Sequence, residues 1–139
     1  MIAKSLPKEP RIFTMAHELK HHLTDSSLGY SYCDQSNVSE HIEIGAEIFA
    51  AELIFPEQNF TAWMEMHGIK AKKCEPETIV HLKRDTKTTL SYSGLVKRAE
   101  FLGFIDLGAF ARIKWKNLEE EIYGVPIYKK RRLRRKARA

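Results

Sequence analysis

The chain has 139 residues and a mass of 16.1 kDa, the usual size of one domain. Its 43% hydrophobic and 29% charged residues exclude a fibrous chain and a chain that is disordered throughout. It contains no run of the roughly 18 apolar residues that span a membrane, and the N-terminal MIAKSLPKEP lacks the apolar segment of a secretory signal. We therefore expect a cytoplasmic protein without membrane contact.

Positive charge is concentrated at the C-terminus. Eight of the 23 Lys and Arg residues lie between Lys129 and Arg138, so residues 1–128 carry 15 basic and 18 acidic side chains, a formal net charge of −3. We expect residues 1–128 to form a single domain. We expect residues 129–139 to be a basic, disordered tail, because they contain too little apolar surface to pack. Such a tail can add weak, salt-sensitive contact with nucleic acid.

Two helices are predicted in the first half of the chain. The first, over about residues 10–24, has apolar residues at helical spacing: Ile12, Ala16, Leu19 and Leu23. A polar, turn-rich loop over residues 25–38 follows. The second helix covers about residues 40–55, with Ser39 as its N-cap and Pro56 after its end. Its apolar stripe consists of Ile42, Ala46, Phe49 and Leu53.

One short helix and one strand are predicted elsewhere. The helix follows Pro56, ends at Gly68 and carries Phe60, Trp63 and Met64. Past Gly108, residues 111–115 (ARIKW) alternate between apolar and polar side chains, which is typical of a half-buried strand.

A helical hairpin is predicted over about residues 76–102. Pro76 suits the first turn of a helix over 76–85, and Ser91 suits the N-cap of a helix over 92–102. The same stretch also fits a helix-turn-helix, which points to DNA binding. Its second helix offers only two strong phosphate contacts, Lys97 and Arg98. We therefore favour a packing role for the hairpin.

The motif His17-Glu18-Leu19-Lys20-His21 is the part of the sequence that points most directly to a chemical function. Residues four apart project from the same face of a helix, so His17 and His21 can hold one metal ion while Glu18 reaches a water bound to it. Zinc suits this pattern, because neutral imidazoles bind it and three protein ligands leave a fourth position for water. We expect Glu18 to be the general base that takes a proton from this water during attack on a peptide carbonyl.

The third ligand is expected on the second helix. Glu43 lies in its first turn, 22 residues beyond His21, and Glu47 lies four positions later on the same face. We take Glu43 as the ligand and Glu47 as an acceptor for the outer ring N–H of a ligand histidine. Spacing alone leaves Glu47, Glu40 and His41 open as the ligand.

The two helices together resemble a known family. Residues 11–22 (RIFTMAHELKHH) and 43–56 (EIGAEIFAAELIFP) are similar to the ImmA/IrrE family of metallo-endopeptidases. In that family, an R-x-F-T-x-A-H-E-x-x-H helix is followed by a helix of pattern E-x-x-A-x-x-F-A-A-x-L that ends at a proline. The resemblance is close over about residues 11–56 and looser to about residue 105.

The resemblance implies roles for four residues, with His17, His21 and Glu43 as metal ligands and Glu18 as the base. The family is associated with cytoplasmic cleavage of helix-turn-helix repressors, which implies a regulatory protease of narrow specificity. Many members have Gly in place of Lys20 and Asn in place of Glu47. Only 16 residues precede His17, whereas members usually begin upstream with strands, so we expect a short or missing N-terminal sheet.

Four other side chains are candidates for supporting roles. Tyr30, Tyr32 or His41 could donate a hydrogen bond to the oxyanion, and the sequence does not choose among them. Cys33 could act as an inhibitory fourth ligand, but Cys33 and Cys74 form no CxxC pair, and we interpret both as reduced structural thiols.

These patterns predict an α+β, mainly helical, zincin-like metallopeptidase domain. The predicted function is zinc-dependent hydrolysis of a peptide bond in a cytoplasmic regulatory protein, specifically a helix-turn-helix transcriptional repressor. The alternative is a nucleic-acid-binding regulatory module in which the metal is structural or the site is inert.

Overall fold

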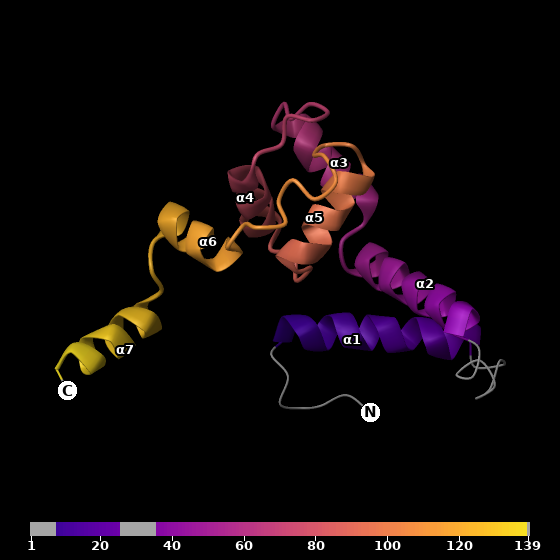
Figure 1. Ribbon diagram of the computed structural model, residues 1–139, viewed down its shortest axis with the longest axis horizontal. Helices are drawn as coiled ribbons and strands as arrows, with labels where there is room; N and C mark the ends of the chain where they lie inside the picture. Colours follow the sequence, from indigo (N-terminus) through magenta and orange to yellow (C-terminus); the bar gives the residue numbers. More distant parts are fainter. Residues whose placement is uncertain (1–7, 26–35, 139) are drawn as a thin grey trace.

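The computed structural model describes residues 8–25 and 36–138 and shows a helical protein (Figure 1). Its elements are α1 (Lys8–Lys20), the π-helical turn η1 (His21–Asp25), α2 (Ser36–Ile54), α3 (Glu57–Met66), α4 (Pro76–Thr86), α5 (Tyr92–Phe101), α6 (Trp115–Tyr123) and α7 (Ile127–Ala137). The prediction of a mainly helical fold is confirmed. The β part of the predicted α+β class is not found, because no strand occurs within the described ranges.

The core lies between α3, α4 and α5. Its fully buried side chains include Phe60, Met64, Ile79, Leu82, Leu90 and Leu95. The predicted short helix after Pro56 is confirmed as α3, and Gly68 follows its end with a positive φ of 68°. Helices α4 and α5 pack against each other, as the predicted hairpin requires, and Ser91 caps α5 by accepting a 3.1 Å hydrogen bond from the amide of Gly94.

Helices α1 and α2 form the most extensive helix pair in the described structure. Ala16, Ala46 and Ala50 are buried, and such small side chains let two helix backbones approach closely. Helix α2 begins at Ser36, so the prediction of Ser39 as its N-cap is wrong: helical hydrogen bonding extends one turn further toward the N-terminus. Residues 26–35, most of the predicted loop, lie outside the described residues.

A polar junction joins the C-terminal end of α2 to α3 and α5. Arg98 donates to the carbonyl of Phe55 and forms a 3.3 Å ion pair with Glu52. The carboxylate of Glu52 also accepts a 3.0 Å hydrogen bond from the amide of Glu57 at the start of α3. One partly buried arginine therefore links the end of α2 to α3 and α5.

Helix α1 has a separate attachment to the core through Lys83 on α4. Its ammonium group lies 3.2 Å from the carboxylate of Glu9 and donates to the carbonyls of Thr88 and Leu90. The side chain of Lys83 is only 15% exposed, so water screens this ion pair less than a surface pair.

The strand predicted over residues 111–115 is wrong. This stretch contains consecutive turns, with backbone bonds from Ala111 to Gly108 and from Ile113 to Phe110, and α6 begins at Trp115. The Trp115 ring stacks on Tyr92 with centroids 5.1 Å apart, and Phe110 packs edge-on against the same indole. These aromatic contacts hold the segment against α5, so Trp115 is partly buried without strand pairing.

The basic C-terminal segment is the helix α7 and not the disordered tail that its composition predicts. Lys and Arg have high helix propensity, which explains how the segment is helical with so little apolar content. None of its residues is buried, and it projects from the opposite end of the molecule to α2 (Figure 1). An ion pair between Lys129 and Glu120 connects it to α6. The expectation of one domain over residues 1–128 stays a prediction.

Candidate metal centre

Two histidines on α1 face one carboxylate on α2. The Nε2 atom of His17 lies 3.0 Å from Oε2 of Glu43, and the Nε2 atom of His21 lies 3.0 Å from Oε1 of the same side chain. The two Nε2 atoms are 3.1 Å apart, and the imidazole rings meet edge to face at 68°. The helix pair therefore brings three ligand atoms of types that zinc prefers to one point.

These distances can be compared with those of a tetrahedral site. With metal–nitrogen and metal–oxygen bonds of about 2.0–2.1 Å, neighbouring ligand atoms of a tetrahedron lie about 3.3 Å apart. The two Nε2 atoms, 3.1 Å apart, are within a few tenths of an ångström of that value, and each lies 3.0 Å from its own oxygen of the Glu43 carboxylate. One ligand atom from each of the three residues lies within 4.8 Å of the other two. The residues present thus fit a zinc ion with one open position.

Burial differs between the three ligands. The side chains of His17 and His21 are 18% and 16% exposed, whereas that of Glu43 is 51% exposed. The centre is therefore closed on its histidine side and open to solvent beside Glu43, as access by a substrate requires. The π-helical turn η1 begins at His21, and such local widenings of a helix are frequent at functional sites.

Among the candidates for the third ligand, Glu43 is the one that the structure places beside His17 and His21. Glu40 and His41 are exposed on α2, and neither belongs to the His17, His21 and Glu43 cluster. Glu47 is also exposed and makes no hydrogen bond or ion pair with either histidine, so the structure does not bring it to the position expected of an acceptor for a ligand N–H.

Glu18 is exposed and lies between the two histidines in the sequence. Its carboxylate makes no hydrogen bond or ion pair with any residue that the structure describes. It is therefore available to accept a proton, as a general base requires.

The remaining candidates divide into two groups. Tyr30, Tyr32 and Cys33 lie outside the described residues. Cys74 is a free, buried thiol near the end of the loop that leads into α4, and burial raises the pKa of its thiol to about 11. The interpretation of Cys74 as a structural thiol is confirmed.

An open groove of about 520 Å³ lies one helical turn from the candidate metal centre and is bounded by α1, α2 and α5. Phe13, one turn before His17, and Glu47, one turn after Glu43, both line it. No sequence pattern could reveal it, because its walls come from elements up to 88 residues apart along the chain, from Phe13 to Phe101.

A comparison with family models supplies independent evidence. The model of the IrrE N-terminal-like domain, Peptidase M78, matches residues 1–88, a range that contains both ligand helices, α3 and α4. Searches of curated proteins and of solved structures found no match. No helix in the described ranges is sufficiently long and apolar to cross a membrane. On this match, the chain belongs to the Peptidase M78 family of IrrE N-terminal-like domains, a family of metal-dependent peptidases.

Proposed function

We propose that this chain is a zinc-dependent endopeptidase that hydrolyses a peptide bond in a cytoplasmic regulatory protein. The observation that carries the proposal is the convergence of His17, His21 and Glu43, whose ligand atoms lie within 4.8 Å of one another, in a family of metal-dependent peptidases. The open side of the centre leaves room for a carbonyl and a water molecule.

Each residue has a separate task in this proposal. Bound zinc supplies Lewis-acid chemistry, which polarises a carbonyl and makes water a stronger acid. His17 and His21 present Nε2 atoms to the ion, and Glu43 adds a negative charge that favours a cation over protonated histidines. The Glu18 carboxylate takes a proton from the attacking water molecule and returns it to the leaving amine.

The substrate is proposed to be a helix-turn-helix transcriptional repressor, on the strength of the family resemblance. Co-expression of the chain with a repressor encoded nearby tests this directly. We expect a single cut in the repressor, and no cut when the chain carries Glu18→Gln. A repressor that stays intact with the zinc-loaded wild-type chain would contradict this substrate.

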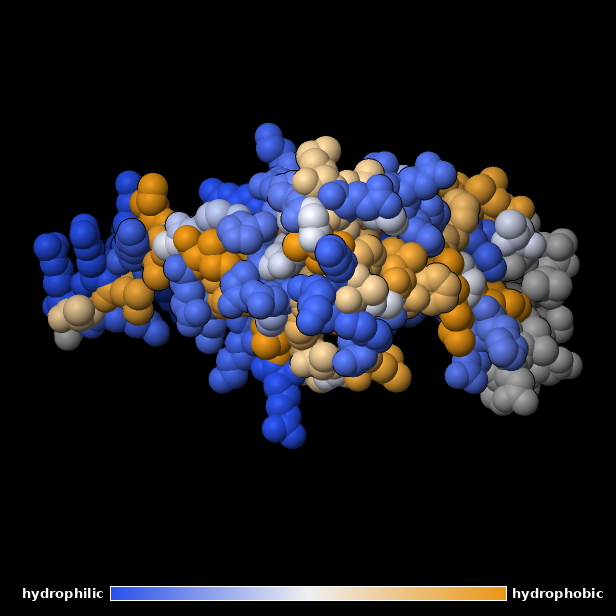
Figure 2. Space-filling model, turned by 90° about the horizontal axis from the view of Figure 1, so that it is seen from above, coloured by the Kyte–Doolittle hydropathy of each residue, from blue (hydrophilic) through white to orange (hydrophobic). Residues whose placement is uncertain are grey.

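A nucleic-acid contact through α7 is a second proposal. Eight Lys and Arg residues lie between positions 129 and 138, and they are distributed around the whole circumference of the helix. Figure 2 shows this end of the molecule dominated by hydrophilic surface. A helix with cations on all sides suits a nucleic-acid groove, where phosphates flank it on both sides, whereas a membrane surface requires one apolar face.

Zinc stoichiometry separates the metallopeptidase from a nucleic-acid-binding module with an inert site. We expect about one zinc ion per chain after native purification, measured by atomic emission, and loss of zinc in His17→Ala and His21→Ala. His22→Ala is the matched control, because His22 is exposed on the adjoining turn and lies outside the cluster. If His17→Ala and His21→Ala kept as much zinc as the control His22→Ala, the assignment of the site would be wrong.

A further inference from the structure

The groove lies along α1 and α2, one helical turn from the residues of the candidate metal centre, none of which lines it. Phe13 precedes His17 by one helical turn and Glu47 follows Glu43 by one turn, so both continue the faces that hold the metal ligands. At 1.5 Å per residue, Glu47 lies about 6 Å and Ala51 about 12 Å along α2 from Glu43. An extended peptide covers the same distances in about two to four residues.

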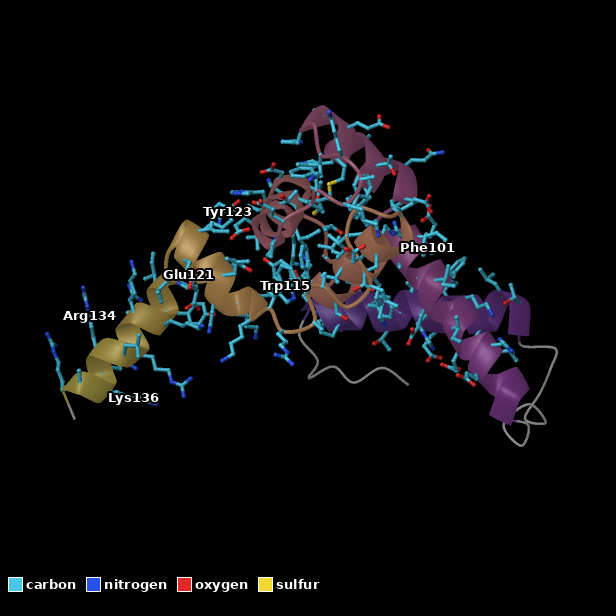
Figure 3. The ribbon with its side chains drawn as sticks, turned by 45° about the horizontal axis from the view of Figure 1, so that its top comes forward. Phe101, Trp115, Glu121, Tyr123, Arg134 and Lys136 are labelled. Carbon is cyan, nitrogen blue, oxygen red and sulfur yellow. The ribbon has the colours of Figure 1, made fainter. Side chains whose placement is uncertain are left out.

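The walls of this groove are mainly apolar. They contain Phe13, Ile48, Ala51, Leu90 and Phe101. The side chains of Ile48 and Phe101 are 64% and 84% exposed. Exposure of large apolar side chains in one groove is unfavourable in water and is typical of a binding surface. Figure 3 shows Phe101 at the end of α5 nearest to α2.

The charges of the groove are largely balanced. Arg98 and Glu52 pair with each other across it, so neither is available to a ligand. Glu47 and Lys97, of opposite sign, have no ion-pair partner within the described residues. The groove therefore has mainly apolar walls, and its three acidic and two basic side chains, Glu57 included, leave a formal net charge of only −1, so a large apolar side chain gains the most contact there.

We infer that this groove holds the substrate polypeptide next to the scissile bond and selects a large apolar side chain, such as Leu or Phe, within about four residues of the cut. The inference rests on the proposed peptidase function. Burial of such a side chain is expected to strengthen binding about tenfold to a hundredfold over alanine.

The test measures binding and cleavage separately. The binding probes are fluorescein-labelled heptapeptides of Gly and Ala with Leu, Phe, Lys or Ala at the centre, titrated into the zinc-loaded Glu18→Gln chain. We expect the Leu and Phe peptides to bind at least tenfold more tightly than the Ala and Lys peptides. Adding Ile48→Glu should abolish this difference. Leu53→Glu should preserve it, because Leu53 is a 54% exposed residue of the same helix that does not line the groove.

The cleavage readout uses the wild-type chain and a library of peptides from a digested proteome. Cleavage without an apolar preference within four residues of the cut would overturn the groove assignment and leave the peptidase standing. Selective binding of Leu and Phe peptides without any cleavage would overturn the peptidase and leave the groove. Equal affinity for all four heptapeptides would overturn the groove. So would a dimer of the wild-type chain that Ile48→Glu dissociates, because a second copy would then occupy the groove.

Discussion

Arg98 on α5 and Glu52 on α2 form a 3.3 Å ion pair in which the arginine side chain is only 11% exposed. The same guanidinium donates to the carbonyl of Phe55, where α2 ends. Helix α2 carries Glu43, so this pair links the position of a candidate metal ligand to the hydrophobic core. Stability and metal binding should therefore both respond to the loss of Arg98.

We expect Arg98→Met to lower the free energy of unfolding by about 1–3 kcal/mol, because it removes the donor to the Phe55 carbonyl and the ion-pair partner of Glu52. Met retains an apolar stem, which separates the lost charge from lost packing. Urea denaturation followed by circular dichroism measures the change. Lys97→Met is the control, an exposed neighbour expected to change stability by less than about 0.5 kcal/mol. If Arg98→Met also changed the free energy of unfolding by less than about 0.5 kcal/mol, the Arg98–Glu52 pair would not link α2 to the core.

Glu18→Gln should separate zinc binding from catalysis. The side chain keeps its size, and Glu18 is exposed and makes no hydrogen bond or ion pair with a described residue, so zinc content and thermal stability should match those of the wild-type chain. Removing the base should lower the rate of peptide cleavage by about 10²–10⁴-fold. Loss of zinc from this variant would mean that Glu18 is a ligand, and retained cleavage would mean that another group is the base.

Stability should fall at alkaline pH because of Cys74. Burial raises the pKa of its thiol from 9.0 to about 11, so the unfolded chain releases this proton at lower pH than the folded chain. Below about pH 9 the neutral thiol makes its full contribution to the free energy of unfolding. As the pH rises toward 11, the free energy of unfolding falls by at most about 2–3 kcal/mol. Urea titrations of the wild-type chain and Cys74→Ala between pH 8 and 11 measure this as a difference in slope. Parallel curves for the two proteins would contradict it.

Removing residues 129–139 should leave zinc content and the thermal transition unchanged, since α7 buries no residue. It should weaken binding to a DNA duplex, most strongly at low salt, because the lost contacts are electrostatic. Fluorescence anisotropy with a labelled duplex at 50 and 200 mM salt provides the measurement. A truncated chain that binds the duplex as tightly as the full chain would show that α7 makes no such contact.

The sequence by itself determined the candidate metal-binding helix. Residues four apart share a face in any α-helix, so His17 and His21 could be paired without knowledge of the fold. The family motifs extended this to Glu43. The caps at Ser91 and Gly68 were also predictable, because capping is a local property of a few residues.

Only the tertiary structure decided the rest. The choice of Glu43 over Glu40, Glu47 and His41 depends on how α2 crosses α1, which the buried Ala16, Ala46 and Ala50 and the Arg98 junction fix. The alternation over 111–115 suggested a strand because local pattern does not reveal that Trp115 stacks on Tyr92. The groove depends on three helices meeting in space, and long-range packing of this kind leaves no periodic signal along the chain.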